Sequence, residues 1–495
     1  MVTIYPNNIR QKKIMRKRFE QQLSLGAVPI SDIKITENTR DDIPKILMAL
    51  QKIFLTKEYN DRIFQILEEC ITKNKKKTGR PGMDLWQIFV LAQLRLGLDI
   101  DYDRLHNLAN CHTEIQGILG IYNRGNQFEE PEKISYQNIK DNVPLLDDEN
   151  LRKINQIIVE FGHKEVFKKK ETESFNCKAD SYVIESNIHY PTDYNLLWDS
   201  AKKCLDVIEY FSENYADLEG WRKIRNWHNE LKHMMRGVFF SQRGGGKGKP
   251  ERIATAASEY CKKATNLLNK INKSKSKLNE KDKAVLEMKL DFYSKMLEKH
   301  INLTYRRLVN KEEIPHEEKV FSIFETYTEL IKKGKLSPDK EFGKRLMILS
   351  DQYGLILDYE LIDNEGERDV ILKVINRVME KYTISSLSLD KGFWAKKINE
   401  ELESKIEKVV MRKPGKPTSK QIEKEQDNSY RKLQGKHNAV ESNINELEHR
   451  GLSRCKDRGF KRFKLYVSIG ICAYNLHKIG NEILKQKQQN LRKAA

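Results

Sequence analysis

Apolar residues recur every three or four positions along most of the chain, which predicts that helices form most of the structure. Helical spacing is found over residues 44–71, 84–98, 196–240, 251–310, 367–382, 437–449 and 460–486. Shorter segments rich in β-branched and aromatic residues, without helical spacing, predict strands over 175–189, 319–325, 341–363, 383–390 and 408–411. A long helical block between two groups of strands predicts an α+β (mixed α/β) core interrupted by an all-α insertion.

This order of elements predicts five segments. They are an N-terminal helical region at 1–165, a first part of the core at 166–195, the all-α insertion at 196–318, the remainder of the core at 319–480 and a basic C-terminal tail at 481–495. Within the first segment, short helices and a basic turn are typical of a helix-turn-helix DNA-binding unit, although small helices also pack as ordinary core. Two prolines and two glycines at 412–436 predict a mobile basic loop.

The charge balance narrows the class of partner. Lys and Arg number 90 against 71 for Asp and Glu in 495 residues, a net charge of +19 that favours nucleic acid. The seven cysteines are scattered without a C-x-x-C pair, which argues against a disulfide framework and favours a reducing cytoplasm. No run of 18 apolar residues occurs, so we expect neither secretion nor a membrane partner.

Three motifs resemble a phosphate-binding loop or a metal site only superficially, and we interpret them as residues without such a role. The segment 243–250, RGGGKGKP, has no first glycine and no Ser or Thr after Lys249, so it predicts a solvated turn and no P-loop. The two histidines of WHNELKH (227–233) are five apart and do not share a helix face as those of a metalloprotease do. Cys111 and His112 lack the second pair that a structural zinc site needs.

Three acidic residues form the candidate catalytic set. Asp180 lies within a strand-like segment, Asp390 at the end of a short apolar strand, and Glu441 within an amphipathic helix. Carboxylates at strand ends face the crevice where α/β sheets perform chemistry. Three of them together can hold two divalent cations for in-line attack on a phosphodiester. Among 71 acidic residues, many other triples satisfy the same pattern.

A family resemblance singles out this triple. SYVIESNIHYPTDYNLLWDSAKKCL (181–205), which follows Asp180, resembles the first catalytic block of bacterial insertion-sequence transposases of the DDE type, in particular the ISNCY-like group. Three later segments resemble the same group in the same order: 333–348, 386–402 and 437–481. The resemblance implies a ribonuclease-H-like core in which Asp180 and Asp390 lie on adjacent strands and Glu441 on a helix.

One departure from the family pattern leaves the third carboxylate open. Many insertion-sequence transposases surround this Glu with Tyr, Arg and Lys, whereas the corresponding positions here hold Gln434, His437 and Glu448. Glu446 and Glu448 are therefore alternatives to Glu441. Glu448 lies two helical turns beyond Glu441 and shares its face.

The resemblance implies a bacterial, cytoplasmic and nucleoid-associated transposase that binds its element's terminal inverted repeats. Two Mg²⁺ ions, for which Mn²⁺ should substitute, would be bound by the three carboxylates. The implied partners are double-stranded DNA and further copies of the chain, in a homodimer or higher oligomer. Alternatives are a ribonuclease-H-like nuclease without strand transfer, a transposase-derived DNA-binding protein without catalysis, and a helical scaffold.

Clusters of basic residues are the candidate DNA contacts, although a charge run is commonly a solvated face. They are Arg10, Lys12, Lys13, Arg16, Lys17 and Arg18 near the N-terminus, Lys75, Lys76, Lys77 and Arg80 in the basic turn, Lys391 beside Asp390, and Arg454, Arg458, Lys461 and Arg462 near the C-terminus.

Overall fold

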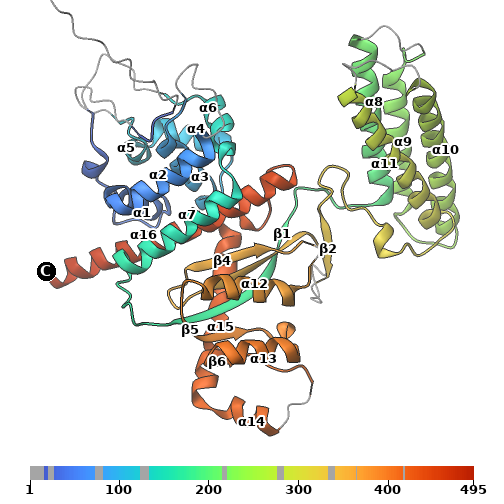
Figure 1. Ribbon diagram of the computed structural model, residues 1–495. Helices are drawn as coiled ribbons and strands as arrows, with labels where there is room; N and C mark the ends of the chain where they lie inside the picture. Colours follow the sequence, from blue (N-terminus) through green and yellow to red (C-terminus); the bar gives the residue numbers. More distant parts are fainter. Residues whose placement is uncertain are drawn as a thin grey trace, which may run out of the picture. The chain divides into compact units, whose positions relative to one another are not determined.

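The computed structural model describes residues 16–19, 27–72, 82–122, 133–214, 220–275, 284–332, 340–363, 365–415 and 419–494. Helices predominate and a mixed sheet accompanies them, so the expected α+β class is confirmed. The chain forms two compact units (Figure 1). Residues 1–185 and 343–495 make up the first unit, and Ser186–Phe342 make up the second.

The N-terminal helices of the first unit pack around one long C-terminal helix. They are η1 (Ile30–Asp32), α1 (Ile43–Leu55), α2 (Lys57–Thr72), α3 (Leu85–Gly97), α4 (Tyr102–Cys111), α5 (Thr113–Ile118), α6 (Tyr136–Asn142), η2 (Val143–Leu145), α7 (Asp148–Phe161) and η3 (Gly162–Val166). The long helix is α16 (Phe460–Ala494), against which α1, α3 and α7 pack. At Gly480, a β-carbon would lie 1.7 Å from the Lys45 carbonyl oxygen, so only glycine permits this approach of α1.

The sheet is centred on β1 (Phe175–Glu185). The other strands are β2 (Glu329–Lys332), β3 (Lys340–Ser350), β4 (Ile356–Leu361), β5 (Ile384–Leu389) and β6 (Lys408–Val410), in the order β2-β3-β1-β5-β6 with β4 also paired to β3. β1 is antiparallel to β3 and parallel to β5, and β5 is parallel to β6. Most side chains on both faces of β1 are buried, as expected for a central strand.

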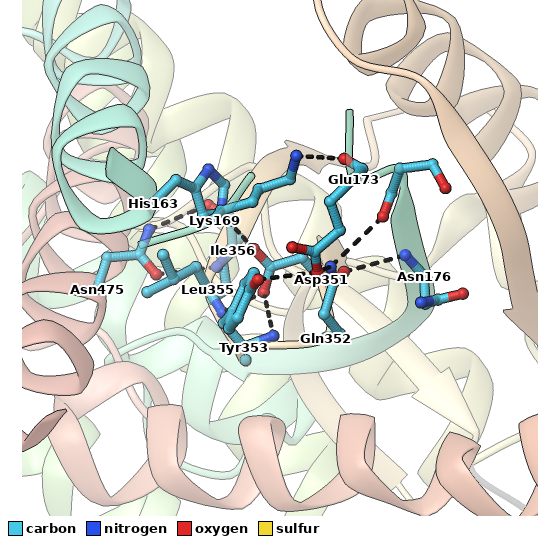
Figure 2. Close-up of polar contacts among 12 residues, drawn as sticks. His163, Lys169, Glu173, Asn176, Asp351, Gln352, Tyr353, Leu355, Ile356 and Asn475 are labelled. Carbon is cyan, nitrogen blue, oxygen red and sulfur yellow. Dashed lines mark hydrogen bonds and ion pairs between the residues drawn. The ribbon is translucent and has the colours of Figure 1, made fainter. Parts of the chain in front are cut away.

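The turn at residues 352–354 joins β3 to β4 and is fixed by a buried carboxylate (Figure 2). Both the Tyr353 and the Leu355 backbone N–H groups donate to Asp351 at 2.9 Å, and Gly354 supplies a positive φ of 78°. The other Asp351 oxygen lies 2.6 Å from Nε2 of His163. Because Asp351 is fully buried and both of its oxygens have partners, this His–Asp pair serves the fold and faces no substrate.

The remaining helices of the first unit follow the later strands. They are α12 (Glu367–Met379), η6 (Lys391–Phe393), α13 (Lys396–Lys405), α14 (Ser419–Gln426), α15 (Asn428–Leu447) and η7 (Glu448–Leu452). The mobile loop predicted at 412–436 is therefore wrong over most of its length. Both prolines precede residue 419, and the Asp427 side chain caps α15 by accepting from the Tyr430 N–H at 3.1 Å.

The second unit is a bundle of four described helices followed by a short irregular segment. These helices are α8 (Asp193–Asn214), α9 (Ile224–Ser241), α10 (Lys249–Lys275) and α11 (Ala284–Leu308), and η5 (His316–Glu318) follows. Each of α8 and α10 packs against both α9 and α11. The strand predicted at 319–325 is wrong, because the Ser322 hydroxyl accepts from the Phe324 and Glu325 N–H groups and forms a turn there instead.

Acid is expected to destabilise the bundle through His300 of α11. The His300 ring is fully buried, and neither of its nitrogens has a hydrogen-bond partner among the described residues. Burial lowers the pKa of His300 to about 4. Since unfolded His titrates near 6.5, the unfolded state takes up the proton first, so stability falls from pH 7 to pH 4 by about 3 kcal/mol.

Denaturation followed by the fluorescence of the bundle's tryptophans (Trp198, Trp221 and Trp227) measures this loss. His300→Leu should remove about 3 kcal/mol of the pH dependence and leave that of the other histidines in place. An unchanged pH dependence in this variant contradicts the assignment to His300.

Candidate active site

The two predicted aspartates come directly after the last residues through which β1 and β5 pair, Asp180 within β1 and Asp390 just beyond the end of β5. The last paired residues of β1 and β5 are Ala179 and Leu389, and Asp180 and Asp390 follow them directly. Asp180 is half-buried, whereas Asp390 is exposed and N-caps η6. This register follows from the alternation of apolar residues in both strands, which sets their common alignment.

The helix α15 lies along β1 and carries Glu441 toward the aspartates. Lys178, Asp180 and Tyr182 alternate along β1 and therefore share one face. The charged groups that shift their pKa values follow the same order along α15 and the residue after it. In addition to burial, Lys436 lowers the pKa of Lys178, Glu441 raises that of Asp180, and Glu448 raises that of Tyr182. Nδ2 of Asn443 donates to the Ser350 hydroxyl at 3.1 Å and holds the helix on the sheet. The Glu441 side chain is exposed.

Burial, together with neighbouring carboxylates, raises the proton affinity of Asp180. Its pKa rises to about 6, mainly because of burial and further because of the charges of Asp390, Glu367 and Glu441. A hydrogen bond from the Ser181 N–H at 2.7 Å opposes the rise. Three other acidic side chains therefore act on Asp180, and a bound cation would neutralise their combined charge.

The donor set has the chemistry that a hard divalent cation prefers, which is carboxylate oxygen. Across the described part of the chain, however, no group of three or more His, Cys, Asp or Glu side chains is arranged to hold a metal ion. One Asp180 oxygen accepts from its neighbour's N–H, and one Asp390 oxygen accepts from the Lys391 N–H at 2.8 Å. Metal binding by Asp180, Asp390 and Glu441 thus stays a prediction and requires these side chains to reorient.

The two alternatives to Glu441 have other neighbours. Glu446 pairs with Arg450, His477 and Lys478 on the side of α15 toward α16. Although burial would raise the pKa of Glu446, hydrogen bonds from His477 and Lys478 lower it to about 2. Glu448 lies at the start of η7, where its charge acts on the Tyr182 hydroxyl. Of the three, Glu441 is the one whose charge is seen to act on Asp180.

Paired substitutions should separate the roles of Glu441 and Glu446. Glu446→Gln should lower the free energy of unfolding by about 3 kcal/mol at neutral pH, since its depressed pKa stabilises the fold above pH 4.5. This deficit should vanish as the pH falls toward 2. Glu441→Gln, on an exposed side chain, should change stability by less than about 0.5 kcal/mol and abolish any DNA cleavage. Denaturation curves and a cleavage assay on both variants measure these effects. Loss of cleavage in Glu446→Gln but not in Glu441→Gln would exclude Glu441 from the site.

Sequence reasoning missed three polar residues around Asp180. Glu367, in the first turn of α12, accepts from the Ser181 hydroxyl at 2.9 Å and pairs with Arg345 at 2.9 Å. Lys178 and His437 both have pKa values lowered mainly by burial. Lys178 lies two residues before Asp180, so the alternation of side chains along the strand could have placed it on the same face as Asp180. No signal in the sequence places Glu367, which reaches the site only through packing of α12.

The candidate DNA contacts have different surroundings. Arg10, Lys12, Lys13, Lys75, Lys76, Lys77 and Arg80 lie outside the described residues. Arg16 donates to the Met83 carbonyl, Arg18 forms ion pairs with Asp61 and Glu68, and Lys17 follows Arg16 in the same segment. Lys17 and Arg18 are exposed, and so are Lys391, Arg454, Arg458, Lys461 and Arg462.

The exposed cluster at 454–462 lies near the candidate site. Arg454 forms a β-bridge with Glu185 at the end of β1, and the Cys455 N–H donates to the Glu185 carbonyl at 2.8 Å. Glu185 is five residues beyond Asp180, a strand distance of roughly 17 Å. This is about the length of five base pairs of duplex DNA.

Comparison of the chain with protein-family models, with curated proteins and with solved structures finds no match. Among the helices of the described residues, none combines the length and the apolar character needed to cross a lipid bilayer.

Proposed function

We propose that this protein is a DDE-type insertion-sequence transposase that hydrolyses a phosphodiester at each element end and joins the freed 3′-OH to target DNA. The observation that carries this proposal is that Asp180 and Asp390 directly follow the last paired residues of the adjacent parallel strands β1 and β5, with Glu441 on the helix that lies along β1. The family resemblance implies this placement within a ribonuclease-H-like core. The mixed sheet centred on β1 supports that finer description of the fold.

The three carboxylates are the residues that would hold Mg²⁺ or Mn²⁺, which would supply Lewis-acid stabilisation of the attacking and leaving oxygens. The chain's own part is to hold the three carboxylates and to position the DNA. Because burial and the neighbouring carboxylates raise the pKa of Asp180 to about 6, this side chain is half ionised near pH 6 and mostly ionised at neutral pH. Lys391, exposed beside Asp390, is placed to contact a phosphate near the site.

The basic cluster at 454–462 is the part of the surface best placed to orient double-stranded DNA toward the carboxylates. Each phosphate that its cations neutralise should steepen the log–log salt dependence of duplex binding by about 0.9. Joining two element ends in one reaction also requires at least two active sites, so we propose that the working form on DNA is a homodimer or a higher oligomer.

A strand-transfer assay tests this proposal. The substrate is a labelled duplex with the sequence of one end of the DNA element that surrounds the coding sequence. The duplex is cut beforehand to expose its 3′-OH and is then mixed with a target plasmid and Mg²⁺. Covalent joining of the label to the plasmid is expected. Cleavage of an uncut duplex without joining would identify a nuclease instead, and binding without either reaction would identify a DNA-binding protein that lacks catalysis.

A further inference from the structure

The segment 222–252 of the helical unit is strongly basic and carries two exposed aromatic rings. Between residues 222 and 252 the chain has nine Arg and Lys residues against two acidic ones. Within α9 the one acidic residue, Glu230, forms an ion pair with Lys263 of α10. Because Glu230 pairs with a cation of another helix, no acidic residue of α9 offsets the positive charges of α9 itself.

The aromatic pair lies where the packed stripe of α9 ends. Ile224, Leu231 and Val238 recur every seven residues and are buried in the bundle core. Phe239 and Phe240 come directly after this stripe and point away from it, with 40% and 57% of their surface exposed. Because a large aromatic ring is usually buried, two neighbouring exposed rings indicate a contact surface.

A cation completes the aromatic pair. The two rings are 5.5 Å apart at 64°, and the Arg243 guanidinium lies 4.6 Å from the Phe239 centroid and 5.2 Å from the Phe240 centroid. The turn that follows is open, since a β-carbon at Gly244, Gly245 or Gly246 would have no atom within 4 Å. Aromatic rings and a guanidinium plane beside cations are the groups on which unpaired bases stack.

We propose that this face, defined by Arg236, Phe239, Phe240 and Arg243 at the end of α9 (Figure 1), binds single-stranded DNA by stacking unpaired bases on the two rings. Charge complementarity favours a polyanion over a protein partner, and the flat rings favour bases over a duplex surface. This inference deepens the proposed function, because cutting and joining strands exposes unpaired nucleotides. The glycine-rich segment 243–250, predicted to be a solvated turn, would then lie beside the bound strand.

The test measures the affinity of the full-length protein for a fluorescent strand of 20 thymidines, without Mg²⁺. Phe239→Ser/Phe240→Ser should weaken binding by about tenfold or more, whereas Phe239→Trp/Phe240→Trp should retain it. Arg236→Gln/Arg243→Gln should reduce the log–log salt slope by about 1.4. Lys289→Gln/Lys295→Gln, which removes two exposed cations from α11, is the matched control and should leave the slope unchanged.

Unchanged single-strand affinity in the serine variant overturns the inference, as does an equal loss in the α11 control. Loss of self-association with unchanged DNA affinity would instead identify a protein-binding face and overturn it too. Asp180→Asn separates this inference from the proposed function, because that variant should keep its single-strand affinity. If no cleavage or joining is ever found while the serine variant still loses affinity, the proposed function fails and the binding face stands.

Discussion

Asp180→Asn is expected to lower the rate of Mg²⁺-dependent DNA cleavage by about 10³-fold or more, and to make the protein more stable. The amide keeps the shape of the carboxyl group but has no charge with which to bind a cation. Any residual rate would come from Asp390 and Glu441 alone. A cleavage time course on a labelled element-end duplex measures the loss.

The gain in stability follows from the raised pKa of Asp180. An unfolded Asp ionises near pH 3.9, whereas Asp180 in the folded chain ionises near pH 6. The folded state thus binds its proton more tightly, and stability falls as the pH rises from about 4 to 6. Above pH 6 the charged form costs up to about 3 kcal/mol, which the neutral amide avoids.

Asp390→Asn is the matched control for this prediction. Its side chain is exposed, so the variant should lose cleavage as Asp180→Asn does but gain little stability. In the wild-type protein, cleavage should increase with pH up to about 6 as Asp180 ionises, tenfold per unit well below that value. Full activity in Asp180→Asn, or equal stabilisation in both variants, contradicts the assigned roles.

The strands and helices themselves were the part of the fold that the sequence could predict. The segment around Asp180, rich in β-branched and aromatic residues, and the short segment before Asp390 formed β1 and β5, whereas their adjacency was implied only by the family resemblance. The long helical block between the strands formed the second unit's helices. These features depend on local periodicity, which is visible in a single sequence.

Features that depend on packing between distant segments could not be predicted. Glu367 reaches Asp180 only because α12 packs beside the sheet, and Glu446 differs from Glu441 only in facing α16. The helices at 419–436 formed because capping and charged helix formers outweighed the nearby prolines and glycines. The segment 319–325 failed to pair because a side-chain hydroxyl competed for its N–H groups.

The largest effect on stability is expected from Asp457→Ala. Asp457 accepts two hydrogen bonds from the Arg95 guanidinium of α3, at 2.9 Å and 2.5 Å. The Arg95 side chain is only 4% exposed, and its guanidinium lies 4.0 Å from the centroid of the Tyr102 ring. Removing the carboxylate leaves a buried cation without its counter-charge, so the free energy of unfolding should fall by about 3–5 kcal/mol.

The neighbouring pair of Lys456 and Asp99 provides the control, because it joins the same two segments at the surface. Lys456→Ala should cost less than about 1 kcal/mol, since an exposed ion pair contributes little. Arg95→Met/Asp457→Leu should recover most of the loss, because replacing both partners by apolar side chains leaves no charge buried. Urea denaturation of the three variants measures these differences. A similar cost for Asp457→Ala and Lys456→Ala would show that burial of Arg95 does not set the energy of the pair.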